Sequence, residues 1–395
     1  MNKLIGSIKT TLALFLIHLF NCFPIKKNKI FFFSYYGSQY GCNPKYITEY
    51  ILKSNDAKTY DLVWAFNNPN LIPEKNGIRK VKVMTVRYFY ELCTSKVIIT
   101  NFRTTELFVK RREQYYIQTW HSSLRLKQIE KDAVESLPEQ YVQMAKKDSL
   151  KCDLLLSGCK YSTDIFKRAF WYSGEIFEQG TPRNDLLIQS NKSTKRRILS
   201  SLNIPINSKV ILYAPTFRKD NQLDVYNLDY DKVLDQLQKK YGGEWTFLIK
   251  LHPHLLSKSS ELVYGERVMD VTAYDDIQEL LSISDVLISD YSSLMFDFSL
   301  TKRPCFLYVP DLVDYTKNDR SLYFDINKLP FKTAVSNKEL LHKIENFSSE
   351  EYQKDLSRFQ KSVGSFENGE ACKHVKEKLD EVCFNKKRRE LHEAV

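Results

Sequence analysis

Short apolar runs alternate with segments of helical periodicity along most of this 395-residue chain. Runs rich in Val, Ile, Leu and Phe are typical of strands buried on both faces of a parallel sheet. The expected strands are residues 29–34, 60–66, 81–83, 96–100, 115–121, 152–157, 209–213, 246–251, 267–271, 286–288 and 305–308. Helical segments between them, such as 44–52, 138–151 and 276–284, predict an α/β fold with helices on both faces of each sheet.

A polar stretch near the middle of the chain separates two such series. Residues 190–207 are polar and carry several basic side chains, so we place a domain boundary near the start of this stretch. A chain of 395 residues is long enough for two or three domains. The resulting division is an N-terminal helix over residues 1–28, a first Rossmann-like domain over 29–190 and a second over 191–395.

The most hydrophobic end of the chain is its N-terminus. Residues 12–17 are apolar, Lys3 and Lys9 precede them, and Lys26 and Lys27 follow. The run is too short for a membrane span, and no small-residue cleavage site follows it. Two alternatives are open: an amphipathic helix that lies in the plane of an anionic membrane surface, or a first helix packed on the fold. The first alternative predicts a peripheral protein at the cytoplasmic face of the cell membrane.

The chain carries a net charge of +11 and eight cysteines. A basic balance suits nucleic acid, an anionic membrane or a phosphate-rich substrate. The basic residues are spread along the chain and no zinc-finger or RNA-recognition motif occurs, so we expect no nucleic-acid partner. The cysteines form no Cys-x-x-Cys pair, which argues against a zinc site and favours a reducing, cytosolic compartment.

Residues 284–297 have the pattern of a buried strand, a tight polar turn and the start of a helix. Asp290, Ser292 and Ser293 are residue types that cap helix N-termini, and apolar positions follow them. A helix that begins there directs its N-terminal N–H groups and its positive dipole end toward the carboxyl end of the preceding strand. This arrangement predicts a site for an anion such as phosphate, with an ordinary capped helix as the alternative.

Five short motifs occur in order along the chain. They are Gln-Thr-Trp-His at 118–121, Gly-Thr-Pro-Arg-Asn-Asp at 180–185, Tyr-Ala-Pro-Thr-Phe-Arg at 213–218, Lys-Leu-His-Pro-His at 250–254, and Asp-Tyr-Ser-Ser with a following Lys-Arg-Pro within 290–304. Together they resemble the CDP-glycerol glycerophosphotransferase family of teichoic acid synthesis. The resemblance implies a GT-B-type fold, in which two Rossmann-like domains face each other across a cleft and C-terminal helices cross back to the first domain. It also implies that residues 29–190 form the acceptor domain and residues 191–395 the CDP-donor domain.

The activity implied by the resemblance is transfer of a polyol phosphate, glycerol phosphate above all, from a CDP-activated donor to a hydroxyl group of a lipid-linked saccharide acceptor, with release of CMP. No cofactor and no metal ion are implied. The nearest alternative is a GT-B glycosyltransferase that uses a nucleotide sugar for capsule or cell-wall polysaccharide. A non-catalytic binder of nucleic acid or membranes is a more distant one. The sequence leaves open the choice between glycerol and ribitol donors, and between primase and polymerase modes.

The candidate base is His121, at the end of the expected strand 115–121. An imidazole titrates near neutral pH and can accept a proton from an attacking hydroxyl group. The resemblance assigns this role to the histidine of the Trp-His motif; a structural histidine at a strand end is the alternative. This chain has Ser122 and Ser123 where the family has Gly-Thr, a departure that bears on which acceptor or donor is used.

The candidate donor site gathers residues that follow expected strands of the second domain. The resemblance makes His252 a hydrogen-bond donor to the diphosphate, and the guanidinium group of Arg218 suits phosphate oxygens. The other candidates in this set are Thr216, Asp290, Ser292 and Ser293. Since the carboxyl ends of parallel strands share one edge of a sheet, these side chains are expected to converge on one cleft that faces His121. His252 and His254 with Asp290 are not expected to bind a metal ion.

The turn at residues 180–185 carries the last candidates. Arg183, Asn184 and Asp185 match a turn of the family. They are expected to shape the hinge between the two domains or to form a turn beside the substrate.

Overall fold

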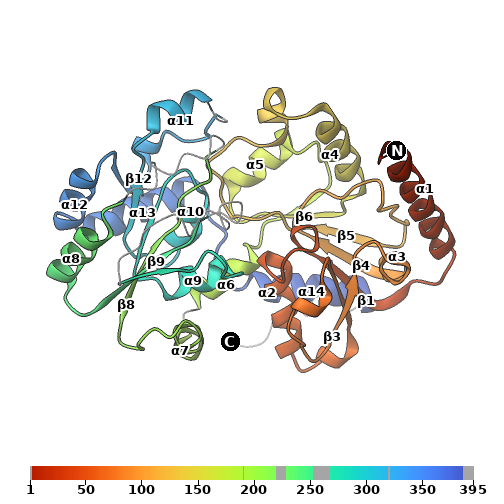
Figure 1. The fold of residues 1–395 in the computed structure, drawn as a ribbon. Helices are drawn as coiled ribbons and strands as arrows, with labels where there is room; N and C mark the ends of the chain where they lie inside the picture. The colour runs from red at the N-terminus through yellow and green to blue at the C-terminus, as the bar shows by residue number, and fades with distance from the viewer. Residues whose placement is uncertain (1, 190, 219–227, 252–266, 319–320, 386–395) are drawn as a thin grey trace, which may run out of the picture. The chain divides into compact units, whose positions relative to one another are not determined.

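The computed structural model of the chain describes residues 2–189, 191–218, 228–251, 267–318 and 321–385 (Figure 1). Contacts between residues divide the chain into two compact units. Unit 1 contains Met1–His121, Glu130–Asp185 and Phe366–Val395, and unit 2 contains Ser122–Ile129 and Leu186–Ser365. The segment Ser122–Ile129, which the sequence placed in the first domain, therefore packs with unit 2.

Unit 1 is built on a seven-stranded parallel sheet. Its strands are β1 Lys26–Phe33, β2 Asp61–Phe66, β3 Ile78–Lys82, β4 Ser95–Thr100, β5 Tyr115–Gln118, β6 Leu154–Leu156 and β7 Glu175–Phe177. The spatial order β3-β2-β1-β4-β5-β6-β7 reverses direction between β1 and β4. In doubly wound sheets such a reversal is where ligands bind, beyond the carboxyl ends of the strands.

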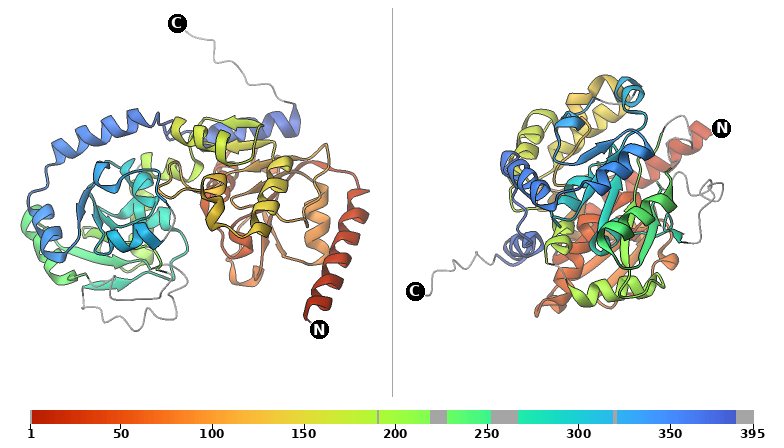
Figure 2. Two further views of the ribbon diagram at one scale, coloured as in Figure 1. Left: turned by 90° about the horizontal axis from the view of Figure 1, so that it is seen from above. Right: turned by 90° about the vertical axis from the view of Figure 1, so that its left-hand side faces the viewer.

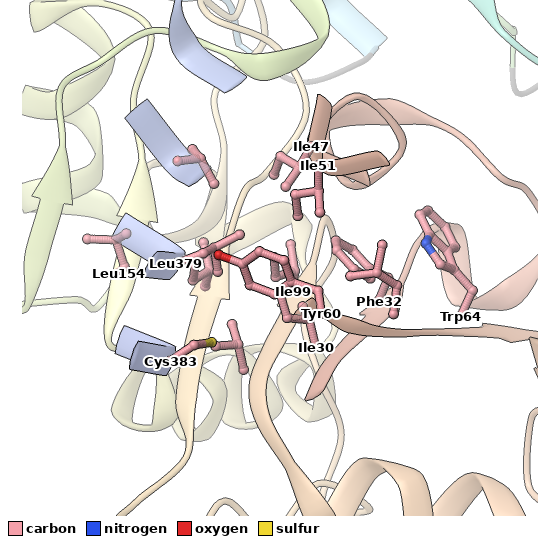
Figure 3. Packing of buried hydrophobic residues seen from close by; sticks show 14 of the residues in the cluster. Ile30, Phe32, Ile47, Ile51, Tyr60, Trp64, Ile99, Leu154, Leu379 and Cys383 are labelled. Carbon is pink, nitrogen blue, oxygen red and sulfur yellow. The ribbon is translucent and has the colours of Figure 1, made fainter. Parts of the chain in front are cut away.

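Helices cover both faces of this sheet. They are α1 Asn2–Asn21, α2 Cys42–Lys53, α3 Val86–Thr94, α4 Glu139–Lys151, α5 Lys160–Ala169 and α14 Ala371–Phe384, with 3-10 helices η1 Tyr35–Gly37, η2 Ala57–Thr59, η3 Pro69–Leu71, η4 Glu130–Ser136 and η5 Pro182–Asn184. Successive residues of β1 alternate between the faces, so Phe32 packs in a core with α2 and α14 (Figure 3), whereas Phe31 packs in a core with α1 and α3. Figure 2 accordingly shows α1 and α14 on opposite sides of the unit 1 strands.

One face of α1 belongs to the core of unit 1. Ala13 and Ile17 are buried there, which is the packed-helix alternative of the sequence analysis. Leu12, Phe15 and Leu19 are instead 57%, 62% and 45% exposed. Across the part of the chain that the structure describes, no helix has both the length and the apolar character needed to cross a bilayer.

Unit 2 carries a six-stranded parallel sheet of order β10-β9-β8-β11-β12-β13, which reverses between β8 and β11. Its strands are β8 Lys209–Tyr213, β9 Trp245–Ile249, β10 Val268–Asp270, β11 Val286–Ser289, β12 Cys305–Tyr308 and β13 Lys332–Ala334. Its helices are α7 Lys192–Ser201, α8 Tyr230–Tyr241, α9 Ile277–Ile283, α10 Leu294–Ser299, α11 Leu312–Asn318, α12 Asn337–Glu345 and α13 Ser349–Ser362, with η9 Ile326–Lys328. In α6 Asp185–Ile188, the first residue is assigned to unit 1 and the other three to unit 2. Two parallel sheets flanked by helices confirm the predicted α/β class.

Some elements differ from their predicted bounds. The strand expected to reach residue 121 ends at Gln118, because Trp120 has a left-handed backbone (φ 49°) that a strand does not accommodate. The strand expected over 246–251 ends at Ile249. β7 was not predicted, because it is a three-residue edge strand with little burial to mark it in the sequence.

Candidate active site

The chain turns sharply after β5, at the carboxyl edge of the unit 1 sheet. Gln118 fixes this turn: its Oε1 accepts a hydrogen bond from the Trp120 backbone N–H (2.9 Å), and its Nε2 donates to the Phe102 carbonyl (2.8 Å). Trp120 adopts φ 49°, which is uncommon for a bulky residue. His121 follows this residue directly, and strained backbone of this kind clusters at functional sites.

Two aromatic rings lie nearly parallel to the imidazole ring of His121. The Trp120 ring is 4.7 Å away between centroids and inclined by 25°, and the Tyr35 ring is 6.3 Å away and inclined by 15°. Tyr35 is itself positioned by a hydrogen bond from its backbone N–H to Asn101 Oδ1 (2.9 Å). His121 is half-buried, so its ring has a defined orientation and is still accessible to a substrate.

The backbone of the same turn is held by Asn43, which the sequence analysis did not single out. Asn43 is completely buried near the start of α2. Its Nδ2 donates to three successive carbonyl oxygens, those of Thr119 (3.2 Å), Trp120 (3.2 Å) and His121 (3.3 Å). Its Oδ1 accepts from the backbone N–H of Arg183 (3.0 Å). One buried carboxamide thus joins the His121 turn to a second turn.

That second turn contains the candidates Arg183, Asn184 and Asp185, all of which are buried in unit 1. Asn184 Nδ2 donates to Glu367 Oε1 (3.2 Å). The Asp185 carboxylate accepts from two backbone N–H groups at the start of α14, at 3.0 and 2.7 Å, and burial raises the pKa of this carboxyl group. The structure therefore gives this turn partners inside unit 1, where it ties α2 and α14 together.

A buried cluster of charged side chains lies next to the ring of Trp120. Arg103 forms ion pairs with Glu130 (3.1 Å) and Asp148 (3.2 Å), and its guanidinium group lies 3.6 Å from the centroid of the Phe170 ring and 5.9 Å from that of Trp120. The Asp148 carboxylate also accepts from the Thr104 backbone N–H and from a buried tyrosine hydroxyl group. The sequence analysis did not predict this cluster, because its members are far apart in the sequence and belong to no motif.

In unit 2, Asp290 connects the loops that follow β8 and β11, the two strands at the reversal of the sheet. Its buried carboxylate accepts from the Thr216 backbone N–H (2.9 Å), from Thr216 Oγ1 (2.6 Å) and from the Tyr291 backbone N–H (2.6 Å). It also forms an ion pair with Arg218 (2.9 Å). The structure thus brings together Thr216, Arg218 and Asp290, three of the candidates, as the sequence analysis expected.

The guanidinium group of Arg218 is extensively bonded within unit 2. Besides Asp290 it contacts the Asp311 carboxylate (2.7 Å), and it lies 4.9 Å from the centroids of both the Tyr291 and the Tyr315 rings. Burial alone would lower the pKa of Arg218, but the two carboxylates raise it overall. A phosphate group at this edge would therefore meet an arginine whose charge is already balanced.

The two serines after Asp290 have different surroundings. Ser292 Oγ accepts from the Leu294 backbone N–H at 3.4 Å, at the start of the six-residue helix α10. Ser293 Oγ accepts from the Leu126 backbone N–H (3.0 Å), and so anchors the Ser122–Ile129 segment within unit 2. A hydroxyl group that accepts one hydrogen bond can still donate its own hydrogen.

His252 and His254 lie outside the described residues. Lys250 follows β9, the strand before them; its Nζ donates to the Thr272 carbonyl (2.6 Å), and burial lowers its pKa. Among the residues that the structure does describe, no group of three or more His, Cys, Asp or Glu side chains could hold a metal ion.

The chain is similar to known proteins in both sequence and structure. Residues 14–380 match the family model described as CDP-glycerol:poly(glycerophosphate) glycerophosphotransferase. The teichoic acid poly(glycerol phosphate) polymerase of Bacillus spizizenii is 33% identical over 370 residues, which cover 90% of this chain and 93% of that protein. The polymerase of the same name from Bacillus subtilis is 35% identical over 367 residues, but the match covers only 48% of that longer protein. One of several solved structures of the wall teichoic acid polymerase TagF, that of a variant with a single substitution, matches with a TM-score of 0.82 and 30% identity, over 96% of both chains.

Proposed function

The chain belongs to the CDP-glycerol:poly(glycerophosphate) glycerophosphotransferase family, and we propose that it transfers glycerol phosphate from CDP-glycerol to a hydroxyl group of a lipid-linked saccharide acceptor, with release of CMP. The family suggested by the five sequence motifs is thereby confirmed. The protein is a transferase of teichoic acid synthesis. The observation that carries the proposed chemistry is the fixed Trp120–His121 turn at the carboxyl edge of the unit 1 sheet.

His121 is proposed as the general base. Its imidazole would accept the proton of the acceptor hydroxyl group as that oxygen attacks the β-phosphorus of the donor. The new P–O bond forms while the bond from the β-phosphorus to the bridging oxygen breaks, and CMP leaves with that electron pair. Most of the catalysis in such a transfer comes from positioning and from stabilisation of phosphate charge, which explains why the turn is so firmly held.

The donor is proposed to bind at the loops after β8 and β11. Thr216, Ser292 and Ser293 offer hydroxyl groups there, and His252 is proposed to donate to the diphosphate. Arg218 is proposed to contact the phosphate groups, with Asp290 fixing its position. This assignment is supported by the place of these loops at the reversal of the sheet, where open α/β folds bind ligands.

The N-terminal helix is proposed to lie on the anionic, cytoplasmic face of the cell membrane as a peripheral anchor. Leu12, Phe15 and Leu19 form an exposed apolar stripe at helical spacing, on the side of α1 that does not enter the core. Lys26 and Lys27 follow and are exposed, which suits anionic lipid headgroups.

A product analysis tests the proposed reaction. Purified protein is incubated with CDP-glycerol and a lipid-linked disaccharide, and the nucleotide and the product mass are measured. Release of CMP with addition of one or more glycerol phosphate units is expected, and His121→Ala should abolish most of it. Release of UDP or GDP from a nucleotide sugar, with CDP-glycerol left intact, would refute the proposal and support the nucleotide-sugar alternative.

A further inference from the structure

An apolar pocket of about 220 Å³ lies within unit 1, at the reversal of its sheet. We call it the β1/β4 pocket, because the ends of these two strands contribute its floor. Residues that line it include Phe33, Tyr36, Met84, Leu92, Phe102 and Leu107. A reversal point is where a doubly wound sheet binds ligands, so the position favours a functional site over a packing defect.

The three threonine hydroxyl groups in the wall of the β1/β4 pocket each have a hydrogen-bond partner within the protein. Thr100 Oγ1 donates to the Phe102 carbonyl (2.9 Å), and Thr104 Oγ1 donates to the buried Asp148 carboxylate. Thr105 Oγ1 accepts from the Leu107 backbone N–H (3.2 Å). A sugar or a polyol phosphate would find its hydroxyl groups poorly matched here, whereas an apolar chain would lose nothing by leaving water.

The pocket adjoins the His121 turn through two consecutive tyrosines. Tyr36 lines the pocket and its ring lies 4.0 Å from that of Phe102, between centroids. Its neighbour Tyr35 has the ring that lies parallel to the imidazole of His121. Phe102 also accepts a hydrogen bond from Gln118, the residue that fixes the turn. Occupation of the pocket would therefore place a ligand next to the elements that orient the proposed base.

The rim of the pocket is apolar and open. Tyr36 and Met84 are 53% and 49% exposed, although large apolar side chains are normally covered. Tyr88 and Leu92 of α3 form another part of the wall, and α3 packs against α1, the proposed membrane helix. The pocket and the proposed membrane helix are therefore both in contact with α3.

We propose that the β1/β4 pocket binds the apolar chain of the lipid-linked acceptor; this inference rests on the proposed function. The acceptor is an amphiphile, and its chain is the part that matches a wall made mostly of aliphatic and aromatic side chains. A cavity of roughly 150 Å³ holds a benzene molecule, so about 220 Å³ accommodates one or two five-carbon units of an isoprenoid or alkyl chain. Each CH₂ group withdrawn from water raises affinity roughly fourfold, so a few such groups would contribute a substantial part of acceptor affinity.

Two variants of the full chain obstruct the pocket in different ways. Met84→Asp places a charge at the rim, at a left-handed backbone position (φ 62°) that aspartate tolerates. Leu107→Trp fills the interior from a half-buried position. Leu71→Asp is the matched control, because Leu71 is 77% exposed in the same unit and does not line the pocket.

Two acceptors separate the role of the lipid from that of the saccharide. CMP release is measured with a short-chain prenyl-linked disaccharide and with the same disaccharide carrying a methyl group. For the prenyl acceptor, both pocket variants should raise KM at least about tenfold, while kcat and the KM for the methyl acceptor stay unchanged; Leu71→Asp should behave as wild type. Titration with geranyl phosphate should show binding to wild type and Leu71→Asp that is lost in both pocket variants.

Three results would overturn the inference: equal KM values of the wild type for the two acceptors, variants that raise both KM values alike, or geranyl phosphate binding that ignores the substitutions. Sedimentation with vesicles that lack acceptor provides a further check. If Met84→Asp reduced that sedimentation, the pocket would bind bulk phospholipid chains and the assignment to the acceptor would be wrong. If geranyl phosphate bound as expected but no acceptor ever yielded CMP, binding of an apolar chain in the pocket would be supported and the proposed function would be refuted.

Discussion

Replacing Asn43 should separate the positioning of the proposed base from the stability of the fold. Asn43→Ala removes one carboxamide that serves three carbonyl groups and one N–H group of two turns. Of these, the Trp120 carbonyl retains a second donor, Thr119 Oγ1 at 3.1 Å. A buried polar group that loses its partner costs about 1–3 kcal/mol, and three such groups remain, so the free energy of unfolding should fall by at least about 3 kcal/mol.

The effect on catalysis follows from geometry. Without Asn43 the backbone of His121 loses its bond to α2, and a displacement of about 1 Å at a catalytic group can cost roughly 10²-fold in rate. We expect Asn43→Ala to lower kcat by about that factor at a temperature where the variant is fully folded, with little change in the Kd for CDP. The assays are CMP release and equilibrium binding of CDP, beside chemical denaturation.

Gln114 supplies a closely matched control. It is also buried in unit 1, its Nε2 donates to the carbonyls of Leu92 (2.9 Å), Cys93 (3.4 Å) and Ser95 (2.8 Å), and its Oε1 accepts from the Arg111 backbone N–H (3.0 Å). Gln114→Ala should therefore lose similar stability but keep kcat. Equal losses of kcat in both variants would refute a positioning role for Asn43, and so would an Asn43→Ala variant with wild-type kcat.

Asn43→Asp adds a pH signature. The aspartate keeps the oxygen that accepts from Arg183, but it replaces the donating NH₂ group, and burial among carbonyl oxygens should raise its pKa. Below that raised pKa the neutral acid can donate one hydrogen bond to the turn, and above it the carboxylate repels the carbonyls. The kcat of Asn43→Asp relative to wild type should therefore rise as the pH is lowered from 8 to 6. A flat ratio would count against this mechanism.

The remaining predictions concern other parts of both units. His121→Ala should lower kcat about 10²–10⁴-fold with CDP binding little changed, and near-wild-type turnover would exclude the base role. Arg218→Ala should weaken CDP binding at least tenfold, and unchanged CDP affinity would restrict Arg218 to a structural role. The substitution should also lower the free energy of unfolding by roughly 3–5 kcal/mol, because it leaves the buried Asp290 and the half-buried Asp311 without their shared cation. Replacing the three exposed apolar residues of α1 by serine should reduce sedimentation with anionic vesicles, and unchanged sedimentation would place the anchor elsewhere. Burial would raise the pKa of Glu91, but Arg79 and Lys29 lower it to about 2, so this carboxylate stabilises unit 1 above its unfolded pKa of 4.5. That stability, about 3 kcal/mol, should be lost as the pH falls from about 4.5 to 2 and be absent in Glu91→Gln, as acid denaturation would show.

The sequence predicted the strands better than the turns, and the reason is physical. Buried parallel strands are marked by local apolar runs, so β1, β4, β8 and β11 could be placed within a few residues. The course of the chain after a strand depends on partners that are distant in sequence. Asn43 precedes a proline near a helix start, which is a recognisable local signal, but its partners lie 76 to 140 residues further along the chain. No local pattern could have supplied them.

At the proposed donor loops, too, the prediction from the strands was right, whereas the partners of the loop side chains were not predicted. Parallel strands bring their carboxyl ends to one edge, so the convergence of Thr216, Arg218 and Asp290 followed from topology alone. The prediction directed both Arg218 and Ser293 toward the phosphate groups of the donor. In the structure Asp311 shares the charge of Arg218, and the Ser293 hydroxyl group accepts from Leu126. Neither Asp311 nor Leu126 belongs to any of the five motifs.

In both units a buried polar side chain fixes the conformation of loops at the carboxyl edge of the sheet. Each sheet brings polar loops together near its reversal, and in each unit one completely buried side chain bonds to the backbone of a loop from another strand: Asn43 in unit 1 and Asp290 in unit 2. A loop on its own would have many conformations of similar energy, whereas a buried polar group must be bonded and so selects one of them. The proposed chemistry needs phosphate and hydroxyl groups held to within a fraction of an ångström, which flexible loops cannot supply unaided. The residues that decide the geometry are therefore the buried partners of the motif loops, and the motif side chains themselves depend on them.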